Sequence, residues 1–134
     1  MKIKINRLMV ATALMLATPA VAGDIHETVA TSFAHAIPNL AGKSLVAVEV
    51  NYPPGGSSRP HRHAKSAFIY AYVVSGTIES QVGGEPAHTY RAGESFFETP
   101  GAHHVLGRSA TEPAKLLAMS VVDTADKELT TPDR

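Results

Sequence analysis

Three histidines in two short segments carry the clearest chemical signal of this 134-residue chain. His61 and His63 are separated by one residue, and side chains at positions i and i+2 of a β-strand project from the same face. His104 follows a Pro100-Gly101 turn, so its strand can return beside the first pair. Three converging imidazoles on one sheet face are typical of a site for a divalent metal.

A carboxylate close to the third histidine extends this pattern. Glu98 stands three residues before Gly101, and a tight turn would place its side chain beside His103 or His104. Two interpretations stay open. Glu98 either completes the metal shell or acts as a general base beside a metal-polarised substrate, or it is an exposed carboxylate at the rim. By strand alternation, we expect His103 to point outward.

The remaining histidines and the absence of cysteine limit other chemistries. His26, His35 and His88 stand alone, and we interpret them as surface or hydrogen-bonded residues. A chain with no cysteine has no disulfide, no thiolate metal site and no cysteine nucleophile. The histidine cluster is therefore the main candidate site.

The segments that must position these residues alternate in hydropathy with a period of two, and turn signals recur about every ten residues. This pattern predicts an all-β antiparallel sandwich or barrel. Only residues 27–36 have a composition that also suits a helix, with an extended arm as the alternative. The expected strands lie at residues 45–52, 68–74, 77–82, 88–90, 95–98 and 114–122.

The beginning of the chain predicts export. Lys2, Lys4 and Arg7 precede an apolar run, and Ala20-Val21-Ala22 resembles a signal-peptidase site, so residues 1–22 read as a secretory signal peptide. We therefore expect a periplasmic or secreted protein cleaved near Ala22, with no membrane contact in its mature form.

The mature chain is expected to form one domain. Its 112 residues divide into an N-terminal arm at 23–44, a barrel at 45–122 and a C-terminal tail at 123–134. The mature chain keeps nine of twelve basic residues against twelve acidic ones, a net charge of −3. This balance argues against nucleic acid or an anionic membrane surface as partner, and favours a small-molecule ligand.

Two segments of the chain resemble the motifs of the cupin superfamily. The first motif, G-x5-H-x-H-x3–4-E-x6-G, is matched by Gly55, the two spaced histidines and Gly76. The second, G-x5-P-x-G-x2-H-x3-N, is matched by Gly93, Gly101 and His104. The resemblance implies a small single-domain cupin of type-2-like pattern, folded as a double-stranded β-helix or jelly-roll barrel. It also implies one divalent metal in the barrel mouth, held here by His61, His63 and His104.

The first motif lacks its glutamate. Counting forward from the histidines places it at Ala67 or Phe68, and counting back from the closing glycine places it at Ile69. A three-histidine centre without a carboxylate is a stronger Lewis acid with an open position for water or substrate. The choice among Fe, Zn, Mn, Ni and Cu stays open.

Three functions remain compatible with the sequence. The first is a metal-dependent enzyme, dioxygenase-, isomerase- or lyase-like, acting on a small oxygenated molecule. The second is a non-catalytic periplasmic module that binds a small ligand or the metal itself. The third is a metal-free cupin whose histidines contact the ligand directly. The resemblance also suggests a homodimer formed through sheet edges, and a shared fold does not decide between these functions.

Overall fold

The computed structural model describes residues 24–134, so the expected signal peptide lies outside the described residues. Between Asp24 and Arg134 the chain forms strands and turns and contains no helix long and apolar enough to cross a membrane. The strands are β1 (Thr28–Ala36), β2 (Lys43–Tyr52), β3 (Ser57–Ser58), β4 (His61–His63), β5 (Phe68–Ser75), β6 (Thr77–Val82), β7 (His88–Arg91), β8 (Ser95–Glu98), β9 (His103–Ser109), β10 (Ala114–Asp123) and β11 (Thr130–Pro132).

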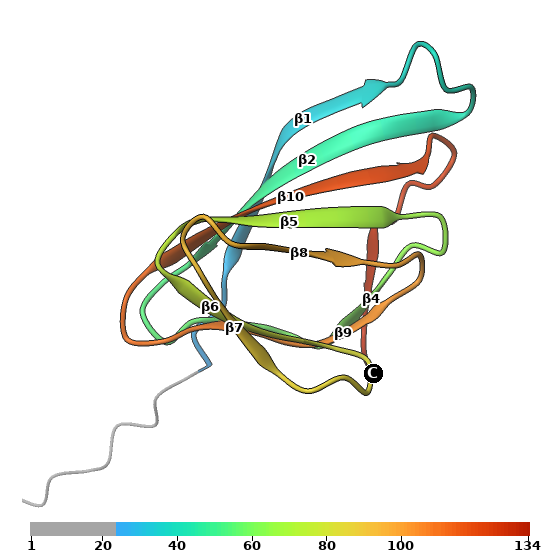
Figure 1. The fold of residues 1–134 in the computed structure, drawn as a ribbon. Helices are drawn as coiled ribbons and strands as arrows, with labels where there is room; N and C mark the ends of the chain where they lie inside the picture. Colours follow the sequence, from blue (N-terminus) through green and yellow to red (C-terminus); the bar gives the residue numbers. More distant parts are fainter. Residues whose placement is uncertain (1–23) are drawn as a thin grey trace, which may run out of the picture.

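These strands form two sheets that face each other (Figure 1). The first sheet has five strands in the order β1-β2-β10-β5-β8. The second has six, in the order β11-β4-β9-β6-β7, with β3 paired beside β9. All pairings between these strands are antiparallel, as in a double-stranded β-helix barrel. The predicted all-β barrel is therefore confirmed.

Strand alternation builds the core between the sheets. Along β5, Ile69, Ala71 and Val73 point inward and are at most 2% exposed. Phe68 and Tyr70, on the same strand, point to the opposite face and are 46% and 40% exposed. The period-two pattern that predicted this strand thus also decides which residues reach the barrel interior.

Both ends of the described residues contribute strands. Residues 28–36, for which the composition left helix and arm open, form β1 along the edge of β2, with a register shift between Thr31 and Phe33. β-branched residues such as Val29 suit this extended conformation, and β2 supplies the hydrogen-bond partners. Within 123–134, β11 pairs with β4, the strand that carries two of the three histidines.

Two motif glycines make the turns that set the registers. Gly76 joins β5 to β6 with a φ of 72°, and a Cβ there would lie 2.3 Å from the Pro113 carbonyl oxygen. Gly101, in the turn before β9, has a φ of 73°. Both positions need the left-handed backbone that glycine adopts without strain.

Candidate metal centre

The three histidines meet on two neighbouring strands of the six-stranded sheet. His61 of β4 is the register partner of His104 of β9, and His63 lies two residues further along β4. Their ring centroids are 4.8 Å (His61–His63), 5.2 Å (His61–His104) and 6.2 Å (His63–His104) apart. One ring nitrogen of each lies within 4.8 Å of the others, so the three residues could hold a metal ion.

Each imidazole has a different set of partners. His61 Nδ1 lies 2.8 Å from the Arg59 carbonyl oxygen and donates a hydrogen bond to it. The other ring nitrogen, Nε2, therefore carries the lone pair that is free for a ligand. Ser80 Oγ lies 3.0 Å from His104 Nε2, which leaves Nδ1 toward the cluster. His63 Nε2 is buried without a hydrogen bond. Polar atoms in this position are usually satisfied, so an unpaired ring nitrogen fits a ligand atom.

Glu98 enters the cluster from the opposite sheet. Its Oε2 lies 3.1 Å from His63 Nε2, and its Oε1 lies 3.4 Å from His104 Nδ1. Its side chain is only 3% exposed, so the alternative of a carboxylate exposed at the rim is wrong. The expected proximity to His104 is confirmed, and the contact with His63 was not expected from the sequence.

The register of β8 explains the missing motif glutamate. Glu98 is the direct partner of Ile69 on β5, one of the positions where the first motif would carry its carboxylate. Side chains at paired positions of an antiparallel ladder share one face. The carboxylate is therefore present in the barrel but comes from the neighbouring strand.

The charges of the cluster are set by burial and by mutual contact. Burial alone would raise the pKa of Glu98, but the close contact with His63, 3.1 Å away, and the positive potential of the three histidines hold the pKa below its usual value. Burial lowers the pKa of His104, against the opposing influence of Glu98. Near neutral pH the site therefore contains an ionised carboxylate and a neutral His104.

A cavity of about 610 Å³ lies in front of the cluster. Its polar end holds the histidines and Glu98, with Tyr52, Ser58 and Ser120 nearby. Burial raises the pKa of Tyr52 to about 12, so its hydroxyl is neutral and shares a 2.8 Å hydrogen bond with Ser58 Oγ. The remaining walls are mainly apolar: Val29, Val48, Val50, Phe96, Leu116 and Ala118.

The other histidines lie apart from the cluster. His103 points outward, as expected, and its Nε2 lies 2.7 Å from Asp133 Oδ2 near the C-terminus. His35 and His88 are exposed, on β1 and β7. His26 lines the cavity mouth, with Nδ1 3.3 Å from the Ser57 carbonyl oxygen.

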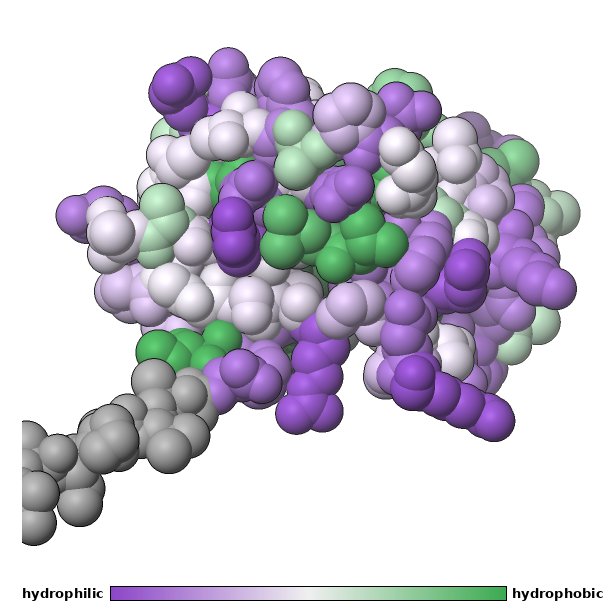
Figure 2. Space-filling view, turned by 90° about the horizontal axis from the view of Figure 1, so that it is seen from below, coloured by the Kyte–Doolittle hydropathy of each residue, from purple (hydrophilic) through white to green (hydrophobic). Residues whose placement is uncertain are grey.

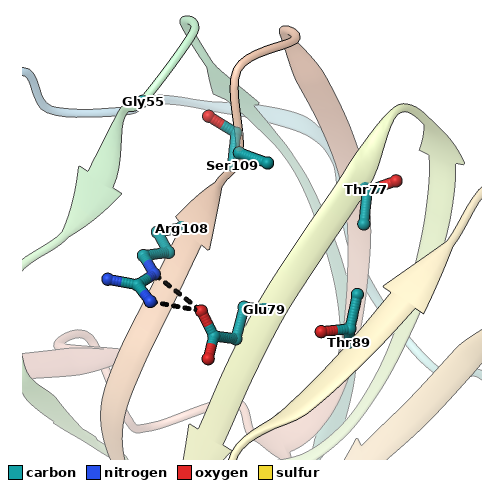
Figure 3. Close-up of a pocket in the computed structure, with 7 residues that line it drawn as sticks. Gly55, Thr77, Glu79, Thr89, Arg108 and Ser109 are labelled. Atoms are coloured by element: carbon teal, nitrogen blue, oxygen red, sulfur yellow. Dashed lines mark hydrogen bonds and ion pairs between the residues drawn. The ribbon is translucent and has the colours of Figure 1, made fainter.

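A second, smaller hollow of about 360 Å³ lies on the outer face of the six-stranded sheet (Figure 3). Arg108 and Glu79 form an ion pair there, with Nη2 and Oε2 2.6 Å apart, beside Thr77 and Thr89. None of the cluster histidines lines this hollow. Its residues form a solvated polar surface rather than a reactive group.

The residues present fit a metal. Three imidazoles supply nitrogen donors that suit first-row transition metals, and second contacts from Arg59 and Ser80 orient two of the rings. His63 Nε2 is buried and makes no hydrogen bond, although Glu98 Oε2 lies 3.1 Å away, so a cation bound at this nitrogen would also lie beside the carboxylate.

Comparison with known families agrees with this arrangement. The family model described as Cupin domain matches residues 48–120, which is more than half of the chain. The chain belongs to the cupin family. No protein of curated function shows significant sequence similarity to this cupin.

Solved structures share its fold at low sequence identity. A conserved protein with a double-stranded β-helix domain from Klebsiella pneumoniae has 18% identity and a TM-score of 0.64, with 81% of this chain and 85% of that chain covered. The DMSP lyase DddQ from Ruegeria pomeroyi has 19% identity and a TM-score of 0.63, over 80% and 51% of the two chains. Oxalate oxidase has 22% identity and a TM-score of 0.52, over 60% and 46%. The cupin spans about half the length of these two enzymes.

Proposed function

We propose that this cupin is an exported metal-dependent enzyme that acts on a small oxygenated molecule with an apolar body. The observation that carries this proposal is the buried, ionised Glu98, which contacts two of the three histidines in the wall of a mainly apolar cavity. Burying a carboxylate costs free energy because the charge loses its water. Buried charged groups of this kind are concentrated at catalytic and binding sites.

The proposed metal ligands are His61, His63 and His104. When bound there, a divalent transition metal such as Fe, Zn, Mn, Ni or Cu would supply Lewis-acid polarisation of an oxygen on the substrate, or redox chemistry for a dioxygenase. Zinc, copper, iron and nickel suit imidazole donors best.

Glu98 is proposed as the general base. Its Oε1 is buried without a hydrogen bond, and its low pKa keeps it unprotonated at neutral pH, so it can accept a proton from a bound substrate. A proton acceptor in this position would serve isomerase- or lyase-type reactions, in which a proton is removed from carbon or oxygen beside a polarised group.

The cavity indicates the kind of molecule. Apolar walls, supplied mainly by the five-stranded sheet, favour an aliphatic or aromatic body, and the histidines and Glu98 favour one or two oxygen atoms. Cupin structures of similar fold include a DMSP lyase and an oxalate oxidase, so reactions on small oxygenated molecules occur on this scaffold.

Metal analysis of the protein purified from its native compartment tests the site. We expect one metal per chain in the wild type, strong loss in His61→Ala and no change in the exposed control His35→Ala. A wild type without stoichiometric metal, indistinguishable from His61→Ala, would refute the metal site.

Glu98→Gln then separates the enzyme from a non-catalytic binding module. The assay follows turnover of hydroxy acids, enols and catechols that carry an apolar group. We expect Glu98→Gln to retain metal at saturation and to lose turnover by about 100-fold or more, as removal of a general base does. Compounds that bind in the cavity but are never converted by the wild type would instead identify a binding module.

A further inference from the structure

One basic side chain lines the cavity. Among the lysines and arginines of the described residues, only Arg59 is part of the cavity wall. It stands in the short link between β3 and β4, and its carbonyl oxygen accepts the hydrogen bond from His61 Nδ1. The backbone of Arg59 is therefore held beside a proposed metal ligand, while its side chain is exposed at the cavity mouth.

His26 gives the guanidinium group of Arg59 a defined place. The His26 ring lies between the Ser57 carbonyl oxygen, 3.3 Å from Nδ1, and Arg59 Nη2, 3.5 Å from Nε2. A carbonyl oxygen only accepts hydrogen bonds, so Nδ1 carries the proton and Nε2 accepts one from the guanidinium. This contact uses a single N–H group of Arg59 and leaves the others for a ligand.

Arg59 differs from the paired cations elsewhere in the barrel. Arg108 Nη2 lies 2.6 Å from Glu79 Oε2 on the outer face of the six-stranded sheet (Figure 3), and Lys43 and Lys115 also pair with carboxylates. Seen from this side, the molecule is mostly purple and white, with green confined to small patches (Figure 2). Within the described residues, no carboxylate lies at ion-pair distance from Arg59. Its charge is therefore available to an anion that enters the cavity.

The charges around the cavity favour a ligand with one negative charge. Two carboxylates line it, those of Glu27 and Glu98. With the proposed divalent metal on the histidines, the metal and Arg59 supply three positive charges against these two, so one positive charge remains. A ligand with one carboxylate balances the cavity, whereas a second carboxylate on the same ligand would leave it charged again.

The cavity has room for a ligand that uses both of its polar regions. Its volume of about 610 Å³ lies within the usual range of small-molecule sites, about 300–1,000 Å³. Apolar side chains such as Val29, Val50 and Leu116 line the same space. A molecule with a carboxylate at one end, an oxygen at the other and an apolar body between them matches all three kinds of lining.

We propose that Arg59 binds a carboxylate of the substrate and so selects monocarboxylic acids that carry a second oxygen-containing group at the opposite end. The inference rests on the proposed function in one respect, since that second group is the one placed at the histidines and Glu98. Arg59 holds the acid through charge-assisted hydrogen bonds. His26 is a positioning residue, because it acts through the guanidinium group and not on the acid itself.

Binding of matched acids and amides tests this inference. The probes are 4-hydroxyphenylacetate, 3-(4-hydroxyphenyl)propanoate and 8-hydroxyoctanoate, each compared with its own amide, which has nearly the same shape but no charge. Titration calorimetry of the wild type with Zn²⁺ should give dissociation constants at least roughly fivefold lower for the acids. Arg59→Gln should bring acids and amides to within about twofold of each other, mainly by weakening the acids. His26→Ala should weaken the acids in part and leave the amides unchanged.

Arg62→Gln is the matched control. Arg62 lies between His61 and His63 on β4 but is exposed and does not line the cavity, so this variant loses the same charge outside it. The preference for acids should persist in Arg62→Gln. Equal binding of acids and amides by the wild type, or a preference that Arg59→Gln retains or that Arg62→Gln removes equally, would overturn the proposal.

Turnover of the same compounds separates this inference from the proposed function. A wild type that prefers the acids through Arg59 but never converts them would support the carboxylate site and refute the enzyme. A wild type that converts the amides as efficiently as the acids would support the enzyme and refute the selection by Arg59.

Discussion

Glu98 and the histidines beside it balance one another's charges. Burial opposes charge on both partners, raising the carboxyl pKa and lowering that of His104. For Glu98 the contacts with His63 and its neighbours outweigh burial, and the net pKa is low. The result is a site prepared for a cation, with a negative charge on Glu98 and a neutral His104 near neutral pH.

This arrangement makes the metal-free protein sensitive to acid. Both groups have a folded-state pKa below the unfolded one, so the unfolded chain binds more protons and stability falls as pH decreases. The loss should begin below about pH 6.5 through His104 and continue below about pH 4.5 through Glu98. Urea unfolding of the chelated protein between pH 8 and pH 4 measures it. Glu98→Gln should remove the fall in the free energy of unfolding at the acidic end of this range. An unchanged pH profile in the variant would contradict the assignment of that fall to Glu98.

At the scale of strands, the β5–β8 ladder determines where the carboxylate comes from. Glu98 and Ile69 face the same interior from paired positions, so the two strands offer equivalent places for one carboxylate. Ile69 is 2% exposed and Glu98 is 3% exposed, so both positions are buried in the wall of the cavity. We therefore expect a carboxylate on either strand to reach the histidines, provided that it points to the interior face of the sheet.

Exchanging the two residues tests this equivalence. Glu98→Ile alone should weaken metal binding about tenfold or more, as loss of a carboxylate beside the ligands does. The double variant Ile69→Glu/Glu98→Ile should restore the metal dissociation constant to within about tenfold of the wild type. Titration of the chelated proteins with Zn²⁺ measures both. If the double variant binds Zn²⁺ as weakly as Glu98→Ile alone, the carboxylate has to come from β8 and the two positions are not equivalent.

Local spacing predicted the three histidines, because each signal is short. The i, i+2 pair spans three residues, and the turn before His104 spans a few more. The contacts of Glu98 with His63 and of Ser80 with His104 depend on pairings far apart in the chain, Ile69 with Glu98 and Ser80 with Gly107. No short pattern predicts those registers. Likewise, β1 became a strand because β2 offered an open edge, which its own composition does not indicate.

Across the whole molecule, the site joins the two sheets. The six-stranded sheet supplies all three histidines, and the five-stranded sheet supplies Glu98. A ligand that binds this cluster contacts both halves of the barrel and only in the folded state. Such a ligand stabilises the fold by mass action.

Metal loading should therefore raise the melting temperature. At a free metal concentration about 100 times the dissociation constant, the gain is about 2.7 kcal/mol, which corresponds to roughly 10 °C for a domain of this size. Calorimetry with and without a chelator measures the shift. His61→Ala should melt at one temperature under both conditions, and a wild type equally indifferent to the chelator would argue against the site.

The pairing of β11 with β4 also affects how the protein is made. Thr130 and Pro132 lie opposite His63 and His61, so the strand that carries two proposed ligands gains its outer neighbour from residues near the C-terminus. A chain is synthesised from its N-terminus, so β11 becomes available after every other described strand. Among the described strands, the outer neighbour of the strand that carries two proposed ligands is therefore the last one to be made.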